Sequence, residues 1–483
     1  MSYFVLFLLL AASPSAEPPV LPSIRSNVGS VSIQDGEVLR RNAWGLSPEA
    51  DPDVYEAELV QGQPKKVTFI TDVDSISFLV EEGKQYDFII RFGDRDCHTR
   101  IVGIRSTPAA QFDEAYRSTH QGKTFVEVPE VYELVNVAIA MTPTGIADPD
   151  LVYQDSEYYK QMRAWFDKYR DQPLLAALDA ELAANPMQYF TLKMNGYAFE
   201  FDEHDKLVPS KVYDRTGSRG DRRNTLRPYL EKLQAFSDAT GFRRFFREHA
   251  ATYQDQITFF RDVADVGEMK RWLDRNFPTS SDYDCYKVIF SPLVAYNQSA
   301  TWLESNGFKE LQAHVNYPYP QSPTRSTQET LSPRSVILYR GNIVFTELNH
   351  GYINPEADKY GDRILKAVSD REHWVDKSKG PNYYPSIELF NEYMNWGLVS
   401  LRLVDYAPPD ELAGMMARVD RMMVEYRGFR RFKEFDAFLV DLYRARKPAQ
   451  TIADLYPQII EWFEKNGAAA LSQESPHGSF RPE

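Results

Sequence analysis

Cysteine is scarce in this 483-residue chain, which contains only Cys97 and Cys285. The two positions fall in segments that the patterns described below assign to different domains. We therefore expect two free or buried thiols, with a bridge between them as the open alternative. Neither cysteine has the sequence partners of a catalytic thiol, and Cys97 and His98 would point to opposite faces of a strand because they are adjacent.

Basic charge is also in deficit, with 55 Lys and Arg against 69 Asp and Glu, a net charge of −14 and a pI near 5.2. This balance excludes a nucleic-acid partner, because phosphate binding needs a basic face. Long apolar runs are missing after the N-terminus, so we expect no transmembrane span in the mature chain. A content of 43% hydrophobic and 26% charged residues is ordinary for a soluble globular protein.

The N-terminus carries the one compact apolar run. Residues 1–16, MSYFVLFLLLAASPSA, end in small residues and predict a secretory signal peptide cut near Ala16. No Lys or Arg precedes the apolar stretch, which keeps a short membrane anchor open as an alternative. We therefore expect an exported protein, periplasmic or secreted.

Patterning along the rest of the chain predicts an α+β protein. Short β-type runs separated by turns indicate a linker and an antiparallel β-sandwich-like module over residues 17–145. Helical spacing then dominates residues 146–445, interrupted by a hairpin at 187–208 and by strands at 286–293 and 310–317, which make a small sheet. A C-terminal helix and a disordered tail are expected over residues 446–483.

The stretch from Ser335 to Tyr360 is the most informative part of the sequence. We expect a strand at 335–339, a turn, and a helix that ends at Asn354-Pro355. On that helix Thr346 and His350 lie about 40° apart and Glu347 is on the same side. This is the geometry of H-E-x-x-H, in which two histidines bind Zn²⁺ and the glutamate polarises a metal-bound water, with threonine at the first histidine position.

A second acidic helix is predicted over residues 386–405, SIELFNEYMNWGLVSLRLVD, with Glu388 and Glu392 on one face. The segments VFTELNHGYINPEADKY and ELFNEYMNW, with RFFREHAATYQDQI, MKRWLDRNFP and KVIFSPLVAYNQ, resemble a bacterial domain-of-unknown-function family of exported proteins similar to gluzincin zinc metallopeptidases. The resemblance implies a zincin-like domain over residues 146–445. It also implies that Glu347 is the general base and that His350 and Glu392 are metal ligands, with zinc the expected divalent metal.

Thr346 departs from the family pattern and removes one nitrogen donor from the expected metal site. Two repairs are conceivable. Glu347 would itself become a ligand, which suits iron or manganese as well as zinc, or His314 or His373 would enter from outside the helix.

Three functional interpretations follow, and whether the chain is an enzyme stays open among them. The first is an exported metal-dependent hydrolase that acts on peptide bonds. The second is a non-catalytic pseudopeptidase that binds a peptide, a protein or an envelope component. The third is a purely structural role for Glu347 and His350.

Overall fold

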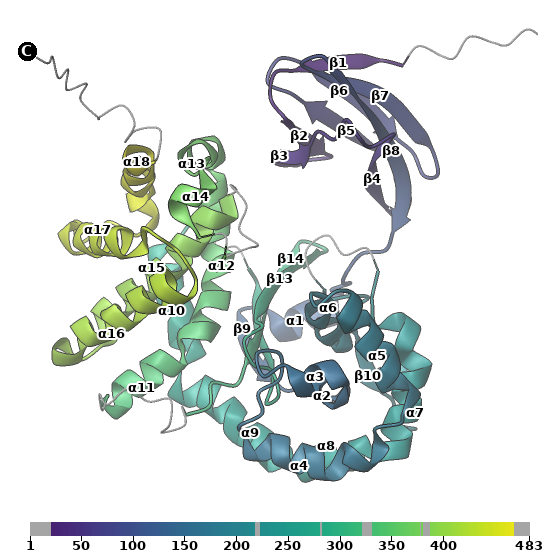
Figure 1. Ribbon diagram of the computed structural model, residues 1–483. Coiled ribbons are helices and arrows are strands. Elements are labelled where there is room, and N and C mark those ends of the chain that lie inside the picture. The colour runs from purple at the N-terminus through teal and green to yellow at the C-terminus, as the bar shows by residue number, and fades with distance from the viewer. Residues whose placement is uncertain are drawn as a thin grey trace, which may run out of the picture. The chain divides into compact units, whose positions relative to one another are not determined.

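The computed structural model describes residues 21–217, 223–280, 283–320, 331–376, 378–379 and 387–467. The expected signal peptide and nearly all of the expected C-terminal tail lie outside these residues. The chain forms two compact units that divide between Thr107 and Pro108 (Figure 1). Within the described residues, none of the helices has both the length and the apolar character needed to cross a bilayer.

The first unit packs two four-stranded sheets against each other. One sheet has the order β1-β7-β8-β4, and the other has the order β3-β2-β5-β6. Alternate residues of the strands are buried, and Phe69 of one sheet meets Phe88 of the other with ring centroids 5.0 Å apart. The predicted antiparallel pairing is confirmed for most strands, although β1 with β7 and β4 with β8 pair in parallel. The strand bounds are β1 Ser23–Ser26, β2 Ser30–Asp35, β3 Val38–Gly45, β4 Asp53–Val60, β5 Lys65–Ile70, β6 Ser75–Val80, β7 Gln85–Phe92 and β8 Arg95–Ser106.

The boundary between the units lies closer to the N-terminus than residue 145. The run TFVEV, expected in the first module, forms strand β9 (Lys123–Glu127) and pairs in parallel with β12 (Cys285–Ser291) of the second unit. A strand joins whichever sheet can complete its hydrogen bonds, and here that sheet is more than 150 residues further along the chain.

The second unit is built around a mixed sheet of order β13-β14-β12-β9. β12 pairs in parallel with β14 (Phe308–Asn316), which pairs antiparallel with the edge strand β13 (Ser299–Ser305). In Figure 1, α12 to α18 gather on one side of this sheet and α2 to α8 on the other. Both faces are therefore covered, which explains why every residue of β12 is buried.

Helices supply most of the second unit. Before the sheet's last strands come α1 Glu114–His120, α2 Glu130–Met141, α3 Pro143–Ala147, α4 Glu157–Phe166, α5 Pro173–Ala184, α6 Gln188–Asn195, α7 Leu230–Thr240, α8 Phe242–Glu248, α9 Ala250–Thr258 and α10 Val266–Asn276. After them come α11 Pro333–Arg340, α12 Asn342–Asp358, α13 Gly361–Ala367, α14 Arg371–Trp374, α15 Ile387–Tyr406, α16 Pro409–Arg421, α17 Phe432–Ala445 and α18 Tyr456–Asn466.

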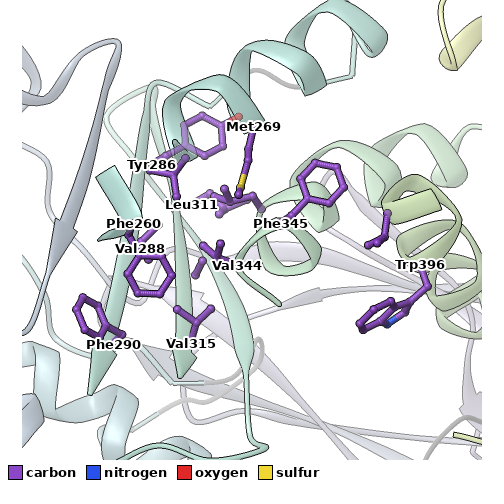
Figure 2. Packing of buried hydrophobic residues seen from close by; sticks show 14 of the residues in the cluster. Phe260, Met269, Tyr286, Val288, Phe290, Leu311, Val315, Val344, Phe345 and Trp396 are labelled. Atoms are coloured by element: carbon purple, nitrogen blue, oxygen red, sulfur yellow. The ribbon is translucent and has the colours of Figure 1, made fainter. Parts of the chain in front are cut away.

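Helix α12 lies directly on the sheet. Figure 2 shows its residues Val344 and Phe345 beside Leu311 and Val315 of β14. The approach is close at Gly351, where an added Cβ would stand 2.3 Å from the Leu311 side chain. A glycine at this point of the helix is therefore needed for the packing that positions α12.

Several local predictions are corrected by the structure. Residues 335–339 are not a strand but part of α11, because Ser332 caps the helix at the backbone N–H of Ser335 and Pro333 occupies its first turn. Helix α12 does not end at Pro355 but continues to Asp358. The expected hairpin at 187–208 is helical in its first half, as α6, and only the short pair β10 (Phe199–Phe201) and β11 (Leu207–Pro209) remains.

Other predictions are confirmed. The strands expected at 286–293 and 310–317 are β12 and β14, and the second acidic helix is α15. Cys97 and Cys285 are free and buried.

Candidate functional site

Helices α12 and α15 bring together the two residues that the motif predicts to meet. His350 Nε2 lies 3.5 Å from Glu392 Oε1, and the two side chains are 16% and 13% exposed. Asn349 Nδ2 donates to the backbone oxygen of Asn395 at 3.1 Å, which joins the two helices next to this pair. Both side chains therefore keep a small exposed fraction amid buried neighbours.

Both ring nitrogens of His350 have side-chain partners. Asn395 Nδ2 donates to His350 Nε2 at 2.9 Å, and His350 Nδ1 lies 3.3 Å from Asn354 Oδ1. In this assignment of the amide orientations the ring proton is on Nδ1 and the Nε2 lone pair is occupied by the Asn395 amide.

Glu392 has a cationic partner. Arg427, which follows the π-helical turn η5 (Met422–Tyr426), donates from Nη2 to Glu392 Oε2 at 2.9 Å. The guanidinium carbon also lies within 6 Å of the ring centroids of Trp396 and Phe429. Arg427 therefore donates to one oxygen of the carboxylate, while the other oxygen lies 3.5 Å from the His350 ring nitrogen.

Glu347 lies close enough to these charges to be affected by them. Burial raises the pKa of its carboxyl to about 7, the Glu392 charge adds to this effect, and His350 and Arg427 oppose it. Lys193 of α6 opposes it as well, and burial lowers the pKa of the Lys193 ammonium to about 7. Lys193 Nζ donates at 2.5 Å to both the backbone oxygen and Oδ1 of Asn297, which lies two residues before the start of β13.

The remaining candidates do not complete this site. Thr346 is buried and its hydroxyl donates to the Ile343 carbonyl at 2.7 Å. Glu388 is exposed at the start of α15. His314 alternates on β14 with Leu311 and Val315, so it faces away from α12. It is completely buried, with Nε2 3.2 Å from Gln312 Oε1, and burial with the nearby Lys193 charge holds its pKa well below the usual range. His373 Nε2 contacts the Asn466 backbone oxygen at 2.7 Å.

The residues present do not fit a tightly bound metal ion. Among the residues that the structure describes, no three His, Cys, Asp or Glu side chains converge as a ligand set, whereas a zinc site takes three or four. The Nε2 atom of His350 is used by Asn395, and the free charge of Glu392 is neutralised by Arg427. Neither proposed repair is seen, because His314 and His373 are elsewhere and Glu347 does not join the pair as a third ligand.

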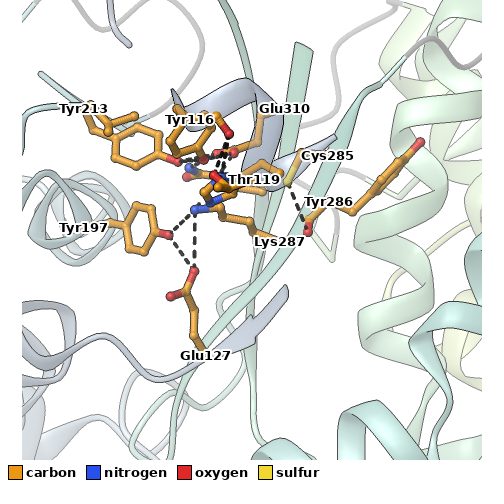
Figure 3. Close-up of polar contacts among 12 residues, drawn as sticks. Tyr116, Thr119, Glu127, Tyr197, Tyr213, Cys285, Tyr286, Lys287 and Glu310 are labelled. Carbon is orange, nitrogen blue, oxygen red and sulfur yellow. Dashed lines mark hydrogen bonds and ion pairs between the residues drawn. The ribbon is translucent and has the colours of Figure 1, made fainter. Parts of the chain in front are cut away.

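A second polar cluster lies on the opposite face of the sheet (Figure 3). The buried Lys287 of β12 donates from Nζ to Tyr197 Oη at 2.7 Å, and Tyr197 donates to Glu127 at 2.5 Å. Glu310 of β14 accepts from Tyr213 at 2.7 Å and from Tyr116.

Sequence reasoning missed this cluster, although its signal is visible in the strands. A lysine interrupts the apolar run YKVIF, and Glu310, Gln312 and His314 recur with the period of a strand. Lys287, Glu127 and Glu310 are therefore paired with one another and with phenol groups.

Comparison with known proteins adds no relative: no family model, no curated protein and no solved structure matches this chain.

Proposed function

We propose that this chain is a metal-independent binding protein, in which a peptidase-like pair of helices holds a peptide or protein segment without cleaving it. The observation that carries the proposal is the Arg427 to Glu392 ion pair beside His350. It supplies a fixed positive charge at the carboxylate where the sequence resemblance implies a metal ligand. An arginine orients and pairs a carboxylate but does not acidify a water molecule as a metal ion does.

The edge strand β13 supports an extended peptide as the ligand. Among the described strands, β13 pairs with β14 alone, and it packs against α12. Within the described residues the outer edge of β13 forms no backbone hydrogen bond, and Thr301 Oγ1 of this strand donates to the backbone oxygen of Gly217 at 3.1 Å. Strand addition at such an edge is a recurrent mode of peptide recognition, and it would lay the peptide beside α12.

Metal analysis is the first test. The purified chain is loaded with Zn²⁺, Mn²⁺ or Fe²⁺, dialysed, and analysed for bound metal beside His350→Ala. We expect far less than one equivalent of bound metal per chain in both the wild type and His350→Ala. One tightly held equivalent that disappears in His350→Ala would overturn the proposal.

Fluorescein-labelled casein is a suitable unfolded probe for the second test, because one sample reports binding by polarisation and cleavage by fluorescence release. We expect saturable binding, no cleavage, and nearly unchanged binding in Glu347→Gln.

The competing candidate is the metal-dependent hydrolase, and the approach of Glu392 to His350 at 3.5 Å favours it, because the resemblance implies that these two side chains are metal ligands. Cleavage of casein that is lost in Glu347→Gln would select the hydrolase instead.

A further inference from the structure

A polar pocket that shares no lining residue with the His350 and Glu392 pair carries an independent inference. It has a volume of about 580 Å³. One wall comes from α10 and from the end of α15, and the other comes from the end of α17 and the residues that follow it. Hydrogen-bond acceptors line the first wall and hydrogen-bond donors line the second, so the pocket is polarised.

Asp405 of α15 places a carboxylate on the first wall. Its Oδ2 accepts from Trp272 Nε1 at 2.7 Å and from Tyr443 Oη at 2.6 Å, and both of these donor side chains are buried. Two buried donors therefore fix the orientation of the carboxylate. Asp405 is itself exposed, and in the described part of the chain its Oδ1 has no hydrogen-bond partner.

Asn276 adds a second acceptor on the same wall. It follows Trp272 by one helical turn on α10 and is only 8% exposed. Its Nδ2 donates to the Trp272 backbone oxygen at 2.9 Å, which fixes the amide orientation because only the nitrogen end can donate. Oδ1 has no partner among the described residues, yet it is not one of the side-chain oxygens that are shielded from water. A side chain that is more than nine-tenths buried therefore keeps a free acceptor at the pocket.

Arg446 and Gln450 supply donors on the second wall. The Arg446 guanidinium carbon lies 3.5 Å from the Tyr443 ring centroid, and its Nη1 donates to the Tyr443 backbone oxygen at 2.6 Å. Within the described residues, no carboxylate lies within 4 Å of this guanidinium. Gln450 Oε1 accepts from the Lys447 backbone N–H at 3.0 Å, which leaves the Gln450 amide nitrogen to donate.

The charges of the two walls are held in place but are not paired with each other. Tyr443 contacts both of them, because its hydroxyl donates to Asp405 and its ring lies under Arg446. Arg275, the other cation of the lining, is already paired with Glu268 at 2.9 Å. A simple anion would be repelled by Asp405, and a simple cation would leave Arg446 without a counter-charge. The ligand that satisfies both walls carries a positive and a negative group.

We propose that this pocket binds a free α-amino acid as its zwitterion. The α-ammonium group would donate to Oδ1 of Asp405 and Oδ1 of Asn276, and the α-carboxylate would accept from Arg446 and from the Gln450 amide. Arginine suits this role because its planar guanidinium matches the geometry of a carboxylate. The inference does not depend on the function proposed for α12 and α15.

Thermal-shift measurements on the full-length chain at pH 7, with each of the standard L-amino acids in turn, test the proposal. A ligand that binds only the folded state raises the melting temperature. Isothermal titration then compares the most stabilising amino acid with its N-acetyl derivative, which lacks the ammonium, and with its carboxamide, which lacks the carboxylate. We expect one site per chain for the amino acid, and binding weakened about tenfold or more for each derivative, because each loses charge-assisted hydrogen bonds.

Two variants assign the binding to this pocket. Asp405→Asn keeps an acceptor for Trp272 and Tyr443 but removes the charge, and Arg446→Gln removes the cation; each should weaken binding about tenfold or more. Arg444→Gln and Asp441→Asn, at exposed positions of α17, are matched controls that should bind as the wild type does.

Arg446 is partly exposed, so Arg446→Gln remains informative if Asp405→Asn does not fold. The assignment is overturned if none of the amino acids binds, or if either derivative binds as tightly as the parent amino acid. Wild-type affinity in Arg446→Gln would also overturn it, because the binding would then occur elsewhere.

Discussion

Replacing Arg427 by methionine tests the ion pair on which the proposed function depends. The substitution keeps much of the apolar contact with Trp396 and Phe429 and removes the guanidinium. Glu392 would then lose a charge-assisted hydrogen bond of 2.9 Å while its side chain stays 87% buried. A hydrogen bond to a charged group contributes about 1.5–3 kcal/mol. Since Arg427 is itself 29% exposed, we expect the lower part of this range, about 1.5–2 kcal/mol.

Urea unfolding followed by tryptophan fluorescence measures this change as a lower midpoint with an unchanged slope. Arg421→Met is a matched control, because Arg421 is exposed at the end of α16, and it should alter the free energy of unfolding by less than about 0.5 kcal/mol. Combining Arg427→Met with Glu392→Gln completes a double-mutant cycle, and we expect a coupling energy of about 1.5 kcal/mol. If the coupling is near zero, or if Arg427→Met is no more destabilising than Arg421→Met, the ion pair does not hold the site together and the reasoning is refuted.

Three further predictions concern metal, burial and pH. In a double variant, Thr346→His supplies the missing imidazole and Arg427→Met frees Glu392. Titration should show one equivalent of bound Zn²⁺ per chain for this double variant and less than one equivalent for either single variant. Glu133→Gln should flatten the pH dependence of stability between about pH 4.5 and 8. Burial raises the pKa of Glu133 to about 8, so the folded state keeps a proton that the unfolded state releases. As pH rises through this range, the free energy of unfolding of the wild type should therefore fall by up to about 5 kcal/mol relative to that of the variant. Hydrogen bonds to Asp51 and Asp87 raise the pKa of His98. The protonated imidazole therefore stabilises the folded state fully below about pH 6.5, and this stabilisation is lost as pH rises through the folded pKa. His98→Asn should lower the melting temperature at pH 5.5 more than at pH 8.

The meeting of His350 with Glu392 was expected from the resemblance to gluzincins, because helical periodicity places residues on a face of one helix but does not say which two helices meet. The same reasoning could not find Arg427, which lies 35 residues beyond Glu392, after a π-helical turn, in no recognisable spacing. Lys193 and Asn297 were equally hidden, because their contact spans 104 positions of the sequence. Local sequence patterns therefore identify only some of the residues of a site that long-range contacts complete.

Local propensity failed where tertiary packing or capping was stronger. The run from Ser335 to Tyr339 has the composition of a strand, but Ser332 and Pro333 before it form a helix start. Pro355 was expected to end α12, yet the helix continues past it. The strand at 123–127 was recognised as a strand but assigned to the wrong sheet, since the pattern of one strand does not identify its partner.

Charge balance links the threonine at position 346, where a metal site would have a histidine, to the positive charge of Arg427. A site with two carboxyl groups and a neutral imidazole is balanced by a divalent cation, and without the second histidine this chain has a weaker means of holding one. Arg427 contributes a single positive charge, which pairs with Glu392 and leaves Glu347 without a full counter-charge. Burial is the largest cause of the rise in the pKa of Glu347 to about 7, and the Glu392 charge adds to it, so this carboxyl group takes up a proton more readily than an exposed one. A resident dication would instead keep both carboxylates ionised, so the protonation state of Glu347 distinguishes the binding protein from the hydrolase without any assay of activity.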